Sequence, residues 1–231
     1  YCGVIIDNTY LYMGTDNGIL VYNYRADRYE QPETDFPTDV RTMALQGDTL
    51  WLGALNGLYT YQLQSRKLTS FDTRRNGLPH NTIYSIIRTR DNQIYVGTYN
   101  GLCRYIPSNG KFEGIPLPVH SSQSNLFVNS LLEDTVRQCI WIGTEGYLFQ
   151  YFPSTGQMKQ TEAFHNNSIK SLALDGNGDL LAGTDNGLYV YHNDTTPLQH
   201  IIHDSRNIQS LTNNIIWNIF ADQEHNIWLG T

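Results

Sequence analysis

Short apolar and aromatic runs alternate with polar turns along the chain, and the same pattern recurs in six copies. Residues 11–22 show it most fully, as an apolar run, Gly-Thr, a polar turn containing Asn-Gly, and a second apolar run. Asn-Gly between such runs is typical of a tight β-hairpin, because it supplies the positive φ angles that a two-residue turn needs. Each copy therefore predicts two antiparallel strands joined by a short turn.

The copies follow one another at a nearly constant interval. The glycines that mark them are 39 to 47 residues apart, at Gly14, Gly53, Gly97, Gly143, Gly183 and Gly230. This period is typical of four-stranded propeller blades. In the third copy the strands are expected at residues 83–89, 93–98, 102–106 and 111–115. The first strands of other copies are expected at residues 40–45, 128–133, 169–174 and 216–221.

The pattern predicts an all-β fold, a β-propeller of four-stranded antiparallel blades. A single blade cannot bury both faces of its sheet, whereas radial stacking covers each face with a neighbour. The sequence holds five complete four-strand repeats and the first two strands of a sixth, which makes about five and a half blades. We expect residues 1–231 to be one propeller segment, truncated at both ends relative to a longer parent chain and part of a seven-bladed ring.

Composition narrows the classes of partner. The 231 residues are 40% hydrophobic and carry a formal net charge of −7, with no basic run longer than Arg74-Arg75. Nucleic acid is therefore a poor partner for this segment. The cysteines Cys2, Cys103 and Cys139 do not recur at one repeat position, so no disulfide framework is expected.

The acidic and histidine residues do not form a recognisable catalytic or metal-binding pattern. Asp134, Asp175 and Asp222 each end a first strand, where a carboxylate accepts hydrogen bonds from the N–H groups of the following turn. The repeat separates them too widely for a pair of acids within roughly 10 Å, as glycosidases need. The seven histidines show no metal-binding spacing. We expect no catalytic residue, no metal and no cofactor.

One repeat position gathers side chains that suit ligand binding. Aligning the first strands places at one equivalent position Arg41, Tyr84, Asn129, Lys170 and Trp217. The next position is always small and polar, with Thr42, Ser85, Ser130, Ser171 and Asn218. Aromatic rings beside hydrogen-bonding groups are typical of a sugar site, since rings stack on apolar sugar faces. The alternative is that these side chains, together with water, only cap the central channel of the propeller.

Two long connections, each leading from the last strand of one blade to the first strand of the next, should overhang the edge on which these aligned side chains lie. Residues 72–82 and 203–215 contribute Arg74, Arg75, His80, Arg206, Asn213 and Asn214. They predict a locally basic edge on an acidic protein, which would suit an acidic or sulfated sugar, with neutral glycans left open.

The sequence of an aliphatic strand, Asp, a short polar turn, Ile-Trp-Leu-Gly-Thr and Asn-Gly-Leu-Tyr-x-Tyr resembles the two-component regulator propeller repeat. The match is best at residues 175–191 and 222–231, departs at the turn in residues 143–151, and lacks the threonine after Gly53. The resemblance implies the periplasmic sensor ectodomain of a bacterial hybrid two-component system histidine kinase, many of which recognise glycan fragments.

We therefore expect an extracytoplasmic ligand-sensing propeller of an inner-membrane protein, which recognises an oligosaccharide and signals to regulate gene expression. The segment itself is expected not to be an enzyme, and the parent chain to be a histidine kinase. Other expected partners are the remaining blades and downstream domains of the same chain, and a homodimer stays open. The alternatives are a propeller lyase or glycosidase, or a protein-interaction or dimerisation propeller with a continuous exposed apolar patch.

Overall fold

The computed structural model of the chain describes residues 2–30, 32, 34–118, 126–161, 167–192 and 199–231. The chain divides into two compact units, Tyr1–Leu117 with Asn125–Phe127, and Pro118–Ser124 with Val128–Thr231. Strands dominate both, and the one helix among the described residues is α1 (Thr73–Asn76). Its four residues begin after the N-cap Asp72 and end at Gly77, which has a φ of 77°. No described helix is long and apolar enough to cross a membrane.

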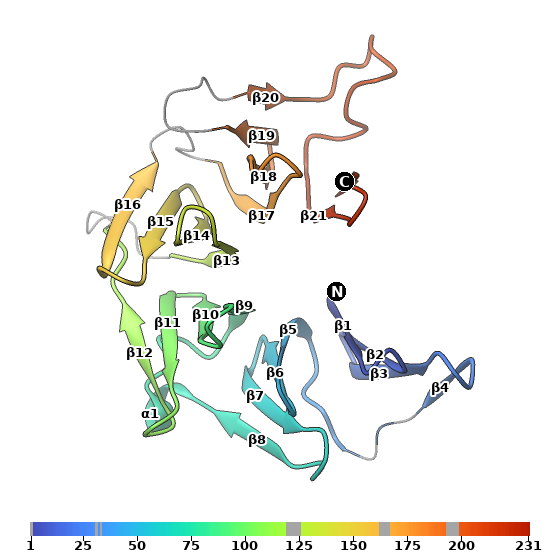
Figure 1. Ribbon diagram of the computed structural model, residues 1–231, viewed down its shortest axis with the longest axis vertical. Helices are drawn as coiled ribbons and strands as arrows, with labels where there is room; N and C mark the ends of the chain where they lie inside the picture. The colour runs from blue at the N-terminus through green and yellow to red at the C-terminus, as the bar shows by residue number, and fades with distance from the viewer. Residues whose placement is uncertain (1, 31, 33, 119–125, 162–166, 193–198) are drawn as a thin grey trace. The chain divides into compact units, whose positions relative to one another are not determined.

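The first unit contains three four-stranded antiparallel sheets, each with its strands in chain order (Figure 1). The first sheet is β1 (Cys2–Ile6), β2 (Tyr10–Thr15), β3 (Gly18–Asn23) and β4 (Arg28–Glu30). The second is β5 (Val40–Gln46), β6 (Thr49–Ala54), β7 (Gly57–Gln62) and β8 (Leu68–Phe71). The third is β9 (Ile83–Arg88), β10 (Ile94–Thr98), β11 (Gly101–Ile106) and β12 (Lys111–Ile115).

The second unit contains two such sheets and a two-stranded one. They are β13 (Val128–Asp134), β14 (Cys139–Thr144), β15 (Leu148–Phe152) and β16 (Gln157–Thr161), followed by β17 (Ile169–Leu174), β18 (Leu180–Thr184), β19 (Gly187–Tyr191) and β20 (Gln199–Ile201). The two-stranded sheet is β21 (Asn218–Ala221) and β22 (Ile227–Gly230). The predicted all-β class and four-stranded blades are confirmed; the number of blades in the ring stays a prediction.

The hairpin turns differ in detail from the sequence-based expectation. Thr15 pairs with Gly18, so the two-residue loop is Asp16-Asn17, and the glycine already begins the next strand. Gly18 carries the positive φ of 109°, and Gly101 and Gly187 repeat it at 101° and 98°. The Thr15 hydroxyl donates to the Gly18 carbonyl at 3.1 Å and accepts from the Asn17 N–H at 3.2 Å. The repeated threonine therefore closes the turn.

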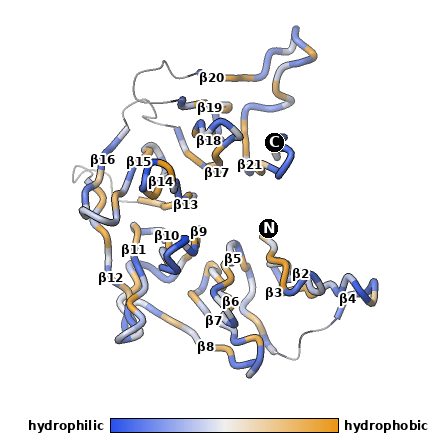
Figure 2. Tube along the Cα trace, in the orientation of Figure 1, coloured by the Kyte–Doolittle hydropathy of each residue, from blue (hydrophilic) through white to orange (hydrophobic). Residues whose placement is uncertain are grey.

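Hydrophobic and hydrophilic stretches separate along the strands and turns, as Figure 2 shows for the hydrophobic stretches of β13 and β17 and the hydrophilic β3–β4 turn. Within each unit, the first strand of a sheet contacts the first strand of the next, from β1 to β5 to β9 and from β13 to β17 to β21. The sheets are thus stacked face to face through their first strands, which is how propeller blades pack.

The repeated glycine lies where two neighbouring sheets approach most closely. A Cβ on Gly53 would lie 2.6 Å from Cγ2 of Ile83, the first residue of the next sheet. A Cβ on Gly143 would meet Cγ2 of Ile169 at 2.6 Å, and one on Gly183 would meet Cγ2 of Ile216 at 2.7 Å. Because real Cβ atoms do not approach carbon so closely, a side chain at any of these three glycines would force the neighbouring isoleucine to shift.

The small polar residues of the first strands link one sheet to the next. The Thr42 hydroxyl accepts a hydrogen bond from the Ile86 N–H at 3.1 Å, and the Ser171 hydroxyl accepts one from the Ile219 N–H at 3.0 Å. Each bond satisfies a backbone donor where two first strands lie side by side.

Asp134 occupies the turn position predicted from the sequence. Its carboxylate accepts from the backbone N–H groups of Val136 and Arg137, from the Arg137 guanidinium at 2.8 Å and from the Trp141 indole at 3.1 Å. Burial raises the pKa of Asp134, but the hydrogen bonds from Arg137 and Trp141 outweigh burial and hold it below its usual range.

The sheet β21–β22 presents an apolar face to solvent. Phe220 and Trp228 pair across its two strands and are 61% and 62% exposed. The equivalent residues Trp51 and Trp141 are 2% and 0% exposed, because each packs against aromatic rings of the next sheet, including Tyr105 and Tyr191 respectively.

We expect Gly53→Ala to destabilise the protein by about 1–3 kcal/mol, since its methyl group would overlap Ile83. Gly114→Ala is the matched control, because no heavy atom lies within 4 Å of its added Cβ. Denaturant unfolding measures both variants, and equal stability would contradict the role assigned to the repeated glycine.

We expect Asp134→Asn to lower the free energy of unfolding by about 3 kcal/mol at neutral pH, because it leaves the Arg137 charge without its partner. Because the folded pKa is depressed, this carboxylate stabilises the fold above about pH 4, and its contribution is lost as the pH falls through that pKa. Unfolding measured from pH 7 to pH 2 should show a shallower acid dependence for Asp134→Asn than for Asp185→Asn, an exposed turn variant. Identical pH profiles would exclude this role.

Candidate ligand-binding site

The aligned residues proposed from the sequence lie at irregularities in the first strands. In β5, Val40 pairs with Ala54 and Thr42 pairs with Gly53, so Arg41 is skipped in the register. The same shift skips Tyr84 in β9, Asn129 in β13 and Lys170 in β17. Such β-bulges re-aim a side chain and are frequent next to functional sites. Trp217 directly precedes β21, with its N–H donating to the Gly230 carbonyl at 2.8 Å.

The turns between second and third strands meet the connections that lead into the first strands. The Tyr99 N–H donates to the Thr82 carbonyl at 3.0 Å, and the Gly187 N–H donates to the Asn214 carbonyl at 2.7 Å. Within each unit, the turns, the connections and the bulges therefore occupy the same edge of the sheets, as the sequence predicted.

In the second unit, Asn129 and Lys170 are connected through two further side chains. Asn129 Nδ2 donates to Glu145 Oε1 at 3.3 Å, and the Ser168 hydroxyl donates to the same oxygen at 3.0 Å. Lys170 Nζ donates to the Ser168 hydroxyl at 3.4 Å. We call Asn129, Glu145, Ser168, Lys170 and Trp217 the second-unit cluster.

Trp217 adds an aromatic surface to this cluster. Its side chain is 63% exposed, and Lys170 Nζ lies 4.9 Å from the centre of its ring. The contact is a cation–π interaction, worth about 0.5–1 kcal/mol at an exposed site. The second-unit cluster thus places a ring, an amide, a carboxylate, a hydroxyl and an ammonium on one edge.

In the first unit, Tyr84 and His80 belong to a set of touching rings. The ring centres of Tyr84 and Phe127 are 5.9 Å apart, those of Phe127 and Tyr99 are 4.2 Å apart, and those of Tyr99 and His80 are 4.8 Å apart. His80 Nδ1 accepts a hydrogen bond from the Thr82 N–H at 3.0 Å.

Three arginines of the candidate site form ion pairs with nearby aspartates. Arg41 pairs with Asp39 at 3.6 Å, Arg75 with Asp72 at 2.5 Å, and Arg206 with Asp204 at 3.2 Å. Hydrogen bonds from the Arg75 N–H and side chain hold the pKa of Asp72 below its usual value. Arg74 lies exposed on α1, while Asn213 and Asn214 accept from the nearby backbone of Ile215 and His203.

The alignment of first strands missed four residues of the candidate site, which are Glu145, Ser168, Tyr99 and Phe127. Tyr99 and Glu145 both follow the repeated Gly-Thr, at a turn position otherwise occupied by Asp16, Leu55 and Asp185. Variation beside two constant residues was the available signal, together with the displaced glycine, Gly146. Ser168 and Phe127 immediately precede a first strand and carried no repeat signal.

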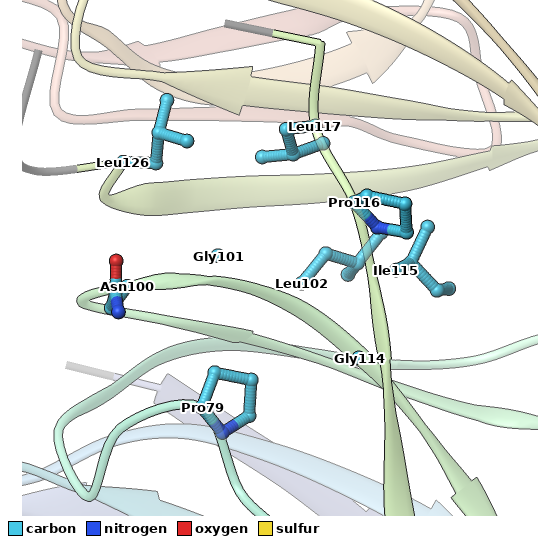
Figure 3. A pocket seen from close by; sticks show the side chains of 9 residues that line it. All are labelled: Pro79, Asn100, Gly101, Leu102, Gly114, Ile115, Pro116, Leu117 and Leu126. Carbon is cyan, nitrogen blue, oxygen red and sulfur yellow. The ribbon is translucent and has the colours of Figure 1, made fainter. Parts of the chain in front are cut away.

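A shallow pocket of about 310 Å³ lies beside the rings of the first unit. Figure 3 shows Leu117 and Leu126 on one side of it and Pro79 on the other. Asn100 is the one polar side chain among its lining residues. The pocket therefore offers apolar contact but little directed hydrogen bonding.

Several acids and histidines in the described ranges have structural partners. Asp222 accepts from the indole of Trp228, the side chain of Asn226 and two backbone N–H groups, and these bonds lower its pKa to about 2. His192 Nδ1 lies 2.6 Å from Asp179, and the His200 ring stacks on Tyr189.

The described residues include no group of three or more potential metal ligands. His203 lies beyond β20, the strand that contains His200. His120 and His165 fall outside the described residues. All three cysteines are free, and burial raises the pKa of the Cys139 thiol to about 11.

Stacked four-stranded sheets with bulged first strands define the chain as a series of β-propeller blades. A family model described as "Two component regulator propeller" matches residues 77–100 and 210–231. These matches identify two of the repeats, at residues 77–100 and 210–231, as two-component regulator propeller repeats.

The chain is similar to solved extracellular domains over its whole length. It is 98% identical, with a TM-score of 0.98, to the extracellular domain assigned to a hybrid two component system, BT4673, of B. thetaiotaomicron. The match covers 100% of this chain and 31% of that one. A second such domain, BT3049 of the same organism, is 20% identical with a TM-score of 0.80, over 99% of this chain and 32% of that one. The latter supports the fold alone.

A curated relative is Histidine kinase P4 of Formosa agariphila. It is 27% identical over 257 aligned residues, which cover 96% of this chain and 17% of the relative. The chain thus spans less than a third of the length of each of these proteins.

Proposed function

We propose that the chain is part of a periplasmic sensor domain that binds an oligosaccharide and controls a membrane-bound hybrid histidine kinase. The similarity to extracellular domains of hybrid two component systems and to a histidine kinase supports the sensor role. In this proposal the kinase activity belongs to the longer protein, and its output is a change in gene expression.

The observation that carries sugar binding is the exposed ring of Trp217 beside Lys170, Asn129 and Glu145. A sugar has an apolar face, which stacks on an aromatic ring, and hydroxyl groups, which need directed donors and acceptors. The second-unit cluster offers both. Within the first unit, the touching rings of Tyr84, Tyr99 and Phe127 also offer aromatic surface for stacking on a sugar.

The acids and histidines favour binding over catalysis. The carboxylates of Asp134, Asp175 and Asp222 accept hydrogen bonds from their own turns, which explains their recurrence without a reaction. A lyase or glycosidase has no specific observation in its favour, so we propose no enzymatic activity for the segment.

A second role follows from the apolar face of β21–β22. The exposed positions of Phe220 and Trp228 correspond to positions that the next sheet covers elsewhere in the chain. We propose that another blade of the longer protein packs on this face. Contact with the remaining blades would bury these rings, which stabilises the fold by about 1.5–3 kcal/mol for each large side chain.

We expect Trp217→Ala in the complete extracellular domain to weaken oligosaccharide binding several-fold, because a stacking ring contributes about 1 kcal/mol beyond its buried area. Tyr84→Ala should act in the same direction. Screening on an array of oligosaccharides identifies a ligand, and calorimetric titration then compares the variants with Tyr29→Ala, an exposed ring on β4. Unchanged affinity in both site variants would exclude the proposed site.

We expect Trp228→Glu to lower the melting temperature of the complete extracellular domain by several degrees, because it would place a charge between two packed blades. Tyr29→Glu, at a position 66% exposed, should have little effect. Equal melting temperatures for the two variants would show that the β21–β22 face stays in solvent.

A further inference from the structure

Glu145 stands out among the residues of the second-unit cluster. It follows Gly143-Thr144 where the repeat departs from its usual turn, with the glycine at 146 instead of 147. Its backbone also forms an isolated antiparallel β-bridge with Ser168, which immediately precedes β17. The altered turn places a carboxylate between the Asn129 bulge and the Lys170 bulge.

Resting on the sugar-binding function proposed above, we infer that Glu145 is the specificity-determining residue of this site and selects an uncharged, hydroxyl-rich sugar. An ionised carboxylate only accepts hydrogen bonds and has room for about four. Asn129 and Ser168 use Oε1, so Glu145, which is exposed, keeps acceptor capacity for the hydroxyl groups of a sugar on Trp217.

The charge of the second-unit cluster is balanced. Lys170 contributes one positive charge and Glu145 one negative charge, and the Ser168 hydroxyl joins them. A carboxylate or sulfate on the ligand would gain the attraction of Lys170 but would also meet the repulsion of Glu145. Neutral hydroxyl groups avoid that repulsion and can bond to both residues.

The other basic residues do not restore a positive edge. Arg41, Arg75 and Arg206 each pair with an aspartate, and Nδ1 of His80 acts as an acceptor. The expectation of an acidic or sulfated ligand rested on Arg74, Arg75, His80 and Arg206 as a locally basic edge. Arg74 lies exposed on α1, but the ion pairs of Arg75 and Arg206 reduce the attraction for an anion, which favours a neutral sugar.

The test begins with an array of oligosaccharides. It holds uronic-acid oligosaccharides and their carboxyl-reduced forms, which share a backbone and differ in charge. It also holds neutral hexose, neutral pentose and sulfated oligosaccharides. The complete extracellular domain should bind one or more neutral members, at least tenfold more tightly than charged members of the same backbone. Preferential binding of charged members would overturn the inference and leave sugar sensing intact. Binding to no member would overturn the proposed function as well.

The variant Glu145→Gln keeps the size of the side chain and removes its charge. We expect its affinity for the neutral ligand to fall several-fold, and its discrimination against the charged member of the pair to shrink. Glu224→Gln is the matched control, because Glu224 lies exposed in the β21–β22 turn, at the opposite end of its sheet.

Thermal unfolding of both variants separates a binding effect from a folding defect. Equal selectivity of Glu145→Gln and Glu224→Gln would overturn the role of Glu145, as would a loss of affinity that leaves the neutral-to-charged ratio unchanged.

Discussion

The close contact between a glycine of one sheet and the first aliphatic residue of the next is the constraint on which the stacking of blades depends. Gly53 against Ile83, Gly143 against Ile169 and Gly183 against Ile216 leave no room for a Cβ atom. Because the interior of a protein is densely packed, this contact sets how closely neighbouring sheets approach. The hydroxyls of Thr42 and Ser171 then reach backbone N–H groups of the next first strand.

The residues of the candidate site lie at the register shift in the first strands, which are the strands that contact one another between sheets. Val40, Val128 and Ile169 lie on one side of a register shift, and small polar residues lie on the other. The residue between them is skipped by the ladder, and Asn129 and Lys170 differ in chemistry at this position while the residues around them stay nearly constant. Variable side chains on a constant scaffold suit the proposed binding role.

Net charge at a surface depends on ion pairing, which a linear pattern does not show. Arg75 and Arg206 contribute to a basic edge when counted along the sequence, yet each has an aspartate within ion-pair distance, as does Arg41. Exposed pairs of this kind add little stability, but they reduce the field that an anionic ligand would experience. Glu145, which the count of basic residues ignored, belongs to the second-unit cluster through its bonds to Asn129 and Ser168.

The sequence by itself determined the strands, their order and the repeat position that Asn129 and Lys170 share, because these are local properties repeated at a constant interval. It also placed Asp134 and Asp222 in their turns, since a carboxylate bonds to N–H groups only a few residues away. Tertiary structure decided which side chains meet. Glu145 reaches Ser168 across a gap of 23 residues, and Lys170 lies over Trp217 of the next sheet. Such contacts depend on the stacking of sheets, which no single repeat encodes.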